Sequence, residues 1–301
     1  MALGVMDQST EIDTPNRVGW PLTLGGVAAF ASAGLAKRAL VCAAWATACA
    51  TICLWSINRT WVPAIEAAIG ALPEKAAIRA GRMVFPDSNP RVLANNRFLT
   101  VVANPSSDLT VDRSSDIQVE IGISEMRFRS FMGWLHCPYP SALELDLSGD
   151  SVLPWWQAWK PSVLTGLGLF LSVSVLVSWS FLATLHTPPA ALFARLLGRQ
   201  AAWPQLWWLA FGSMMPGGAL MSLALVAYAM LQIGMLHLCV LWVCQWLVGW
   251  LYLLGGIFCL PKMRRSPFAV PSPPPISGVD APTSTAPGKN PFNSSESKVD
   301  D

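Results

Sequence analysis

Four long apolar runs constrain the fold of this chain more than any other feature. They cover residues 39–57, 161–185, 206–231 and 235–260, and none of them contains Asp, Glu, Lys or Arg. At 1.5 Å of rise per residue, a helix of about 20 residues crosses the roughly 30 Å hydrocarbon core of a bilayer. Only 13% of the residues are charged, which is well below the share usual in soluble proteins. We therefore expect a membrane protein with four transmembrane helices.

The residues before the first run predict how the chain enters the membrane. Residues 20–36 are apolar, but only Lys37 and Arg38 separate them from the first run, which is too few to reverse a helix across a bilayer. We expect residues 1–38 to form a cytoplasmic tail with an interfacial segment. The tail carries acidic residues and is long, so the helix at 39–57 is predicted to be an uncleaved signal anchor.

The distribution of lysine and arginine predicts the orientation of the four helices. Positive charge collects on the cytoplasmic flanks of membrane spans. Both termini are therefore expected in the cytoplasm, and the segment 58–160 is expected on the other side of a bacterial inner membrane. The flanking basic residues are Arg17, Lys37, Arg38, Arg195, Arg199, Lys262, Arg264 and Arg265.

The segment 58–160 contains a strand pattern. Apolar residues alternate with polar or small ones over residues 117–123, and Met126 and Phe128 continue the alternation. This two-residue period is typical of a strand with one buried face, so Glu120 is expected on a solvated face. The sequence thus predicts one strand running from residue 117 to residue 128.

Further patterns predict an α+β domain that is mainly β and mainly antiparallel. A helix is expected to lie along the outer membrane surface just before the strands. This helix is predicted at 62–72. The remaining predicted elements are a hairpin at 78–85 turning at Ala80 and Gly81, and strands at 98–103 and 143–147.

Two segments on the cytoplasmic side complete the predicted domain organisation. Residues 186–205 are expected to form a loop in which Pro188 and Pro189 open a short interfacial helix. Residues 261–301 contain the run PSPPP and many Ser, Thr and Gly residues. Such a composition cannot bury a core, so a disordered cytoplasmic tail is predicted.

The sequence carries no recognisable catalytic or metal-binding constellation. The acidic residues of 58–160, including DLSGD at 146–150, are interpreted as turn and surface residues. Charged residues at membrane depth usually mark ion or proton paths, so their absence from the four runs argues against an ion-coupled transporter. The net charge of +2 is small, and its basic residues are scattered. We expect no cofactor, no metal ion and no nucleic acid partner, and instead the lipid bilayer together with a protein partner or self-association.

Two features inside the apolar runs are candidate sites. Pro216, Gly217 and Gly218 interrupt the third run, where proline removes a backbone donor and glycine lets another helix approach closely. A packed kink is predicted, and the alternative is an unwound helix that lines a binding site. The second feature is a stripe in the fourth run that packs or faces lipid, or alternatively grips an acyl chain or a flat ligand. It consists of Trp242, Trp246 and Trp250.

Parts of the chain resemble a known group of proteins. These parts are ALPEKAAIRAGRMVFPDSNPRVLANNRFLTVVANP at 71–105, LAFGSMMPGGALMSL in the third run, and WLVGWLYLL at 246–254. They are similar to an uncharacterised group of bacterial inner-membrane proteins related to the Yip-type membrane fold. The resemblance implies an anchor helix, an extracytoplasmic domain, a helical C-terminal membrane region and a location in the bacterial envelope. It implies no catalytic residues.

The function that fits these features best is non-enzymatic. We expect an envelope protein that scaffolds, senses or assists a membrane complex through the domain at 58–160. One alternative is a transport or lipid-handling component that uses the broken third helix. A second alternative is a membrane-embedded enzyme.

Overall fold

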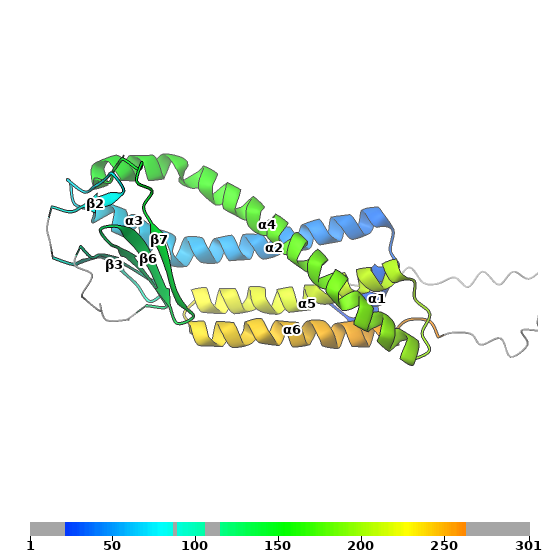
Figure 1. The fold of residues 1–301 in the computed structure, drawn as a ribbon. Coiled ribbons are helices and arrows are strands. Elements are labelled where there is room, and N and C mark those ends of the chain that lie inside the picture. The colour runs from blue at the N-terminus through cyan, green and yellow to red at the C-terminus, as the bar shows by residue number, and fades with distance from the viewer. Residues whose placement is uncertain (1–21, 87–88, 106–114, 263–301) are drawn as a thin grey trace, which may run out of the picture. The chain divides into compact units, whose positions relative to one another are not determined.

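The computed structural model describes residues 22–262, except residues 87–88 and 106–114. This part of the chain is mostly helical and carries a small β region at one end of a helix bundle (Figure 1). Within it, four helices are long and apolar enough to cross a membrane, which confirms the predicted number. They are α2 (Leu35–Thr60), α4 (Gly149–Leu196), α5 (Trp203–Ala229) and α6 (Met235–Phe258). The predicted N-terminal tail up to residue 21 and the Pro-rich tail from residue 263 lie outside the described residues.

The first helices differ in detail from the prediction. Within the predicted interfacial segment lies α1 (Leu24–Ala31). It is capped at its N-terminus by Thr23, whose hydroxyl accepts a hydrogen bond from the Gly26 amide at 3.0 Å. It packs against α5 and α6 and buries Val27 and Phe30. Helix α2 begins before Lys37 and Arg38, so both basic residues are helical.

Helix α4 is much longer than the predicted span. It runs for 48 residues without a break, through Pro188 and Pro189, and so replaces both the predicted second span and the separate interfacial helix. Proline disfavours a helix interior, but tertiary packing can override local preference. Here a buried stripe at helical spacing continues past both prolines, which themselves are not buried. It consists of Ala183, Thr187, Ala190 and Ala194.

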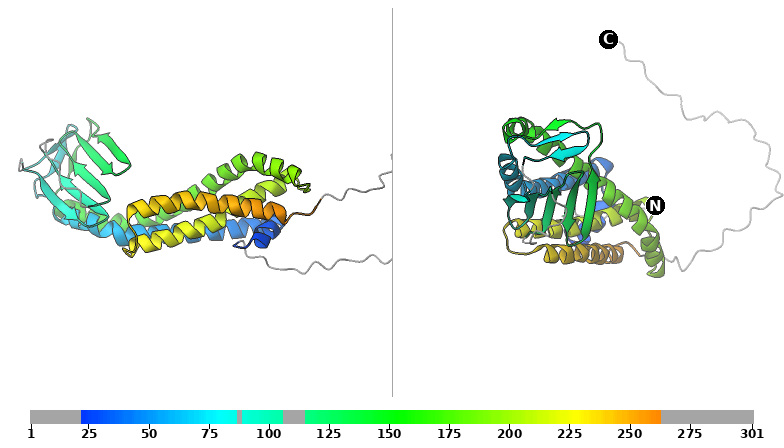
Figure 2. Two further views of the ribbon diagram at one scale, coloured as in Figure 1. Left: turned by 90° about the horizontal axis from the view of Figure 1, so that it is seen from below. Right: turned by 60° about the vertical axis from the view of Figure 1, so that its left-hand side comes forward.

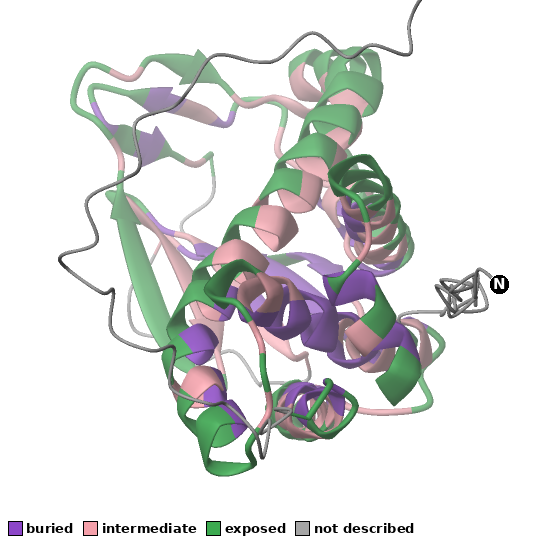
Figure 3. Ribbon diagram, turned by 90° about the vertical axis from the view of Figure 1, so that its right-hand side faces the viewer, coloured by how far each residue is buried: buried purple, intermediate pink, exposed green. Residues whose placement is uncertain are grey.

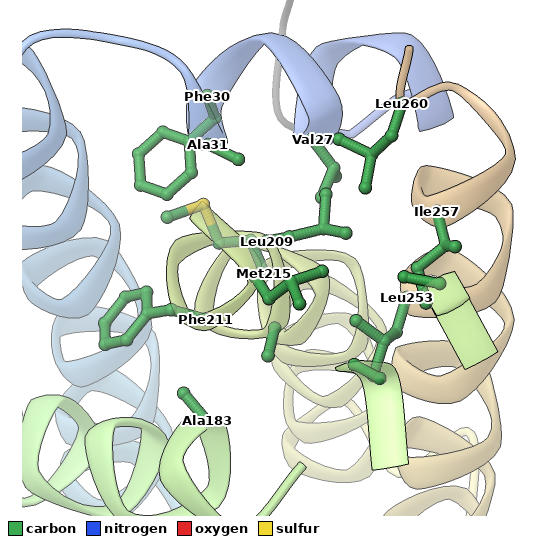
Figure 4. Close-up of a cluster of buried hydrophobic side chains, with 14 of the residues drawn as sticks. Val27, Phe30, Ala31, Ala183, Leu209, Phe211, Met215, Leu253, Ile257 and Leu260 are labelled. Atoms are coloured by element: carbon green, nitrogen blue, oxygen red, sulfur yellow. The ribbon is translucent and has the colours of Figure 1, made fainter. Parts of the chain in front are cut away.

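The core of the bundle surrounds the first half of α5. Leu209 and Met215 of α5 meet Phe30 from α1 and Leu253 and Ile257 from α6 (Figure 4). Buried residues gather where the helices face one another, whereas the outward sides of the helices are exposed (Figure 3). Many of these exposed side chains are large and apolar, as on α4 at Leu169, Phe170, Val173, Val177 and Phe181.

The β region contains two sheets (Figure 2). The larger sheet has the strand order β3-β4-β5-β6-β7, in which only the β4–β5 pair is parallel. The smaller sheet has the order β2-β1-β8. The strands are β1 (Ala77–Arg79), β2 (Arg82–Val84), β3 (Arg91–Asn95), β4 (Leu99–Ala103), β5 (Ile117–Ile121), β6 (Glu125–Ser130), β7 (Gly133–Pro138) and β8 (Leu145–Asp146).

Several predicted elements of this region are confirmed. The predicted helix is α3 (Val62–Gly70), and the predicted hairpin turns at Ala80 and Gly81, which have φ values of 50° and 71°. The single strand predicted over 117–128 is wrong, because the chain reverses after Ile121 and forms the antiparallel pair β5 and β6. The apolar positions change from odd numbers (117 to 123) to even numbers (126 and 128) across this turn, and this change of phase is the sequence signal of the reversal. Strands β3 and β7 were not predicted.

The larger sheet is attached to the end of the bundle where α5 and α6 are joined. The Phe98 ring packs edge-on against the Tyr228 ring of α5, with centroids 4.9 Å apart. The Tyr228 hydroxyl donates a hydrogen bond to the Asp116 carboxylate at 2.8 Å. Arg97 donates to the carbonyl of Ile233, in the α5–α6 loop, at 3.4 Å. These contacts fix the sheet against the helix ends.

Candidate functional site

The main candidate site is an apolar groove between α3 and the larger sheet. Among the strands of this sheet, α3 packs mainly against β3 and β4, so much of the apolar face of β5, β6 and β7 stays open beside it. The groove has a volume of about 720 Å³. Such a volume lies within the range of roughly 300–1,000 Å³ that is typical of ligand pockets.

The strand register explains why the floor of the groove is apolar. Leu99 and Val101 of β4 lie beside Ile117 and Val119 of β5, and Val119 lies beside Phe128 of β6. In a strand, alternate side chains point to the same face, so these residues share one face of the sheet. Ile65, Ile69 and Leu72, from α3 and the residues after it, form the opposite wall. Water in this groove would contact apolar surface, which favours occupation by an apolar ligand.

The groove ends close to the helix bundle. Trp61, between α2 and α3, borders the groove and also packs on the cluster that contains Phe98 and Tyr228. The hairpin of β6 and β7 borders the groove through Met132, Trp134 and other residues of its turn. One end of the groove therefore lies beside the ends of α5 and α6.

The opposite face of the sheet is polar and buried, which contradicts the prediction for Glu120. This residue is 2% exposed, and its Oε1 accepts a hydrogen bond from the Asn104 amide at 2.6 Å. Its Oε2 lies 3.2 Å from the Arg129 guanidinium, and Arg127 approaches within 3.7 Å. Glu120 is in the strand between β4 and β6, with Val102 and Arg127 beside it. A charge that is removed from water needs such partners.

Neighbouring charges also organise the β6–β7 pair. The Arg127 Nε donates to the Glu125 carboxylate at 2.6 Å, and the His136 Nδ1 lies 3.1 Å from the same carboxylate. The hydrogen bond from Arg127, followed by that from His136, lowers the pKa of Glu125. Burial raises the pKa of Tyr139, at the end of β7, to about 12. These groups hold the edge of the sheet in register.

The predicted motif in the third run lies inside an unbroken helix. Residues Pro216, Gly217 and Gly218 are all part of α5, which is helical from Trp203 to Ala229. A Cβ atom at Gly217 would lie 2.7 Å from the backbone oxygen of Gln245 in α6. A Cβ atom at Gly218 would lie 2.7 Å from the Trp179 ring of α4. The two glycines therefore permit close contact of α5 with α6 and α4.

The structure brings this motif together with part of the tryptophan stripe. Gly217, Trp242 and Trp246 border the same small pocket of about 210 Å³ between α4, α5 and α6. Trp250 lies apart from this pocket, and its ring centroid is 4.7 Å from that of His186. Sequence spacing predicted that the three tryptophans share a face of α6, but not that only Trp242 and Trp246 border this pocket.

The groove could not be predicted from the sequence, because the positions of α3 and of the β6–β7 hairpin relative to the sheet were unknown. The apolar alternation of β5 signalled a buried face, yet α3 packs mainly against the neighbouring strands β3 and β4. The exposed apolar residues of the β6–β7 turn, FMGWL at 131–135, were the available signal. Comparison with protein-family models, with curated proteins and with solved structures finds no match to this chain.

Proposed function

We propose that this chain is a non-enzymatic, multi-pass protein of the bacterial inner membrane that binds a lipid acyl chain in the groove of its sheet domain. The sheet domain, formed by α3, the two sheets and their loops, would lie outside the cytoplasm. Both termini would lie in the cytoplasm. Through the bound lipid the domain would assist a membrane complex. The open apolar groove beside the helix ends is the observation that carries this proposal.

The chemistry of the groove supports an acyl chain as the ligand. Its floor and its helical wall consist of aliphatic and aromatic side chains, as at Val119, Phe128 and Ile69. Polar ligands would lose hydrogen bonds to water there without gaining replacements. A flexible hydrocarbon chain loses none and gains burial of apolar surface.

The position of the groove supports a membrane lipid as the source of the chain. Trp61 borders the groove directly after α2, one of the four candidate spans. Tryptophan is enriched at the level of the lipid headgroups. A lipid in the adjacent leaflet would therefore be close to the groove. The basic residues that flank the spans, and the resemblance to bacterial inner-membrane proteins, support the proposed orientation and location.

A groove-filling substitution tests the proposal. Val119→Trp places a large ring in the groove, whereas Val92→Trp makes the same change on an exposed position of β3 in the same sheet. Full-length variants in nanodiscs would be irradiated with a phospholipid that carries a diazirine on its acyl chain. We expect several-fold less labelling of the sheet domain in Val119→Trp only. Equal labelling of wild type, Val119→Trp and Val92→Trp would refute acyl-chain binding in the groove.

A second candidate function is transport or lipid handling through the helix bundle. It is favoured by the pocket that Gly217 shares with Trp242 and Trp246. Replacing both Gly217 and Gly218 with Leu would displace α5 from α6 and α4 and so alter this pocket, and should change flux or lipid binding in reconstituted vesicles if the pocket is used. Unchanged flux and binding in a folded variant would leave the sheet-domain groove as the functional site.

A further inference from the structure

The turn of the β6–β7 hairpin has an unusual composition. Ser130 pairs with Gly133, so Phe131 and Met132 form a two-residue turn. Such turns ordinarily carry Asn, Asp or Gly, because these residues suit the required backbone geometry and are solvated readily. Here the side chains of Phe131 and Met132 are 57% and 77% exposed. Local turn formation does not explain two large apolar residues at this position.

The exposed apolar surface continues from the turn into β7. Trp134 is 69% exposed and Leu135 is 61% exposed. We call the residues Phe131, Met132, Trp134 and Leu135 the hairpin tip. Soluble surfaces scatter such side chains singly, and a cluster of them marks a surface that contacts another apolar phase or protein.

The hairpin tip lies at the level where a candidate membrane span begins. Ser130 and Phe131 border the same pocket as Met235 and Leu236, the first two residues of α6. The hairpin reaches toward the joined ends of α5 and α6 (Figure 1). Because α6 has 24 residues, and a span of about 20 crosses the hydrocarbon core, its first residues lie at the edge of that core. A hairpin beside them is at the depth of the headgroups.

We propose that the hairpin tip inserts into the phospholipid leaflet at this end of the bundle. An aromatic ring with a polar N–H group, such as Trp134, is suited to the boundary between headgroups and acyl chains. Phe131, Met132 and Leu135 would bury apolar surface in the same layer. This insertion depends on α6 spanning the membrane and is independent of what occupies the groove.

The inserted tip would also connect the leaflet to the groove. Met132, Trp134 and Leu135 border the groove on one side, and Trp61 borders it near the end of α2. An acyl chain could then pass from the leaflet into the groove between Trp61 and the hairpin without crossing bulk water. This second part rests on the proposed function.

The main competing occupant is a second copy of the chain, paired along the edge strand β7. Edge strands can pair with a further strand through their free backbone groups. However, the large apolar residues are concentrated at the turn, and the far end of β7 carries His136 and terminates at Pro138. Strand pairing would use the whole length of β7, whereas a membrane surface would contact the tip alone. The distribution of the side chains therefore favours the membrane.

Depth-dependent fluorescence quenching tests insertion in the full-length protein. A cysteine would be placed at Met132 in a variant whose seven native cysteines are replaced, labelled with the fluorophore NBD, and reconstituted in phosphatidylethanolamine and phosphatidylglycerol nanodiscs. A label at Glu144, which is exposed in the same domain, is the matched control. We expect blue-shifted emission and several-fold stronger quenching by lipids with a spin label near the headgroup at position 132. Emission and quenching equal to those at position 144 would overturn the proposal.

Two further measurements separate the alternatives. Disulfide cross-linking between copies through a cysteine at position 132, together with weak quenching by lipid, would identify the tip as a protein interface and overturn insertion. Strong quenching at position 132 combined with unchanged diazirine labelling in Val119→Trp would support insertion while refuting acyl-chain binding. Replacing Phe131 and Met132 with Ser should slow exchange of a labelled lipid into the groove several-fold. Unchanged exchange in this variant would refute the connecting route.

Discussion

The close contact of α5 with α6 at Gly217 predicts a measurable loss of stability in Gly217→Ala. The added methyl group would start 2.7 Å from the Gln245 backbone oxygen, well inside the ordinary contact distance of about 3.5 Å. A backbone atom cannot rotate away as a flexible side chain can. The two helices must therefore separate locally by most of an ångström, and the surrounding core must follow.

The magnitude follows from two opposing effects. Overpacking a well-packed core costs about 1–3 kcal/mol. Replacing glycine with alanine in a helix interior contributes about 0.5–1 kcal/mol in the favourable direction. We expect Gly217→Ala to lower the free energy of unfolding by about 0–2.5 kcal/mol as the net result of these two terms. Gly166→Ala in α4 is the matched control, because nothing lies within 4 Å of its added Cβ atom.

Equilibrium unfolding of the full-length protein in mixed micelles with increasing denaturing detergent measures both variants. Gly166→Ala should be neutral or slightly stabilising, so the two variants should differ by about 1–3 kcal/mol. The geometric reasoning would be refuted if Gly217→Ala were as stable as Gly166→Ala. Such a result would mean that α5 and α6 are farther apart than the structure places them.

Three further predictions concern the sheet domain. Glu120→Ala leaves two arginines without their buried partner. Hydrogen exchange in β5 should therefore show a decrease in the free energy of unfolding near the lower end of the about 3–5 kcal/mol expected for a broken buried pair. As the control, Glu144→Ala at an exposed position should lower the free energy of unfolding by less than about 0.5 kcal/mol. The hydrogen bond from Arg127 lowers the pKa of Glu125 in the folded state, so the unfolded state binds this proton more readily. The resulting stability is present at neutral pH and is lost as pH falls below 4.5 through the folded pKa, and acid titration of Glu125→Gln followed by circular dichroism should show a weaker dependence. Cys137 is exposed, so a membrane-impermeant maleimide should label it in intact spheroplasts, and labelling of a cysteine placed in the tail under the same conditions would contradict the proposed orientation.

The sequence predicted those features that depend on local pattern. Long uncharged apolar runs indicated the four candidate spans, because a helix of this length and composition has few other stable environments. The alternation at Ile117–Ile121 indicated β5, and Ala80 and Gly81 indicated the turn between β1 and β2. Each of these signals depends on residues within one element.

Features that depend on contacts between elements were predicted poorly. The continuation of α4 through Pro188 and Pro189 depends on packing against the bundle, which the prolines themselves do not reveal. The burial of Glu120 depends on Asn104 and on two arginines of the next strand. The groove depends on how much of the sheet α3 covers. None of these three features produces a periodic pattern of residues within a single element of the sequence.

The length of α4 has a mechanical consequence. At 1.5 Å per residue its 48 residues extend for about 72 Å, more than twice the thickness of a hydrocarbon core. Near one end, Lys160 forms an ion pair at 2.8 Å with Glu66 of α3. Near the other, His186 packs against Trp250 of α6. Because α4 stays helical over its whole length, although its four internal prolines lack backbone donors, a tilt of α4 at the sheet domain also displaces its other end in the bundle.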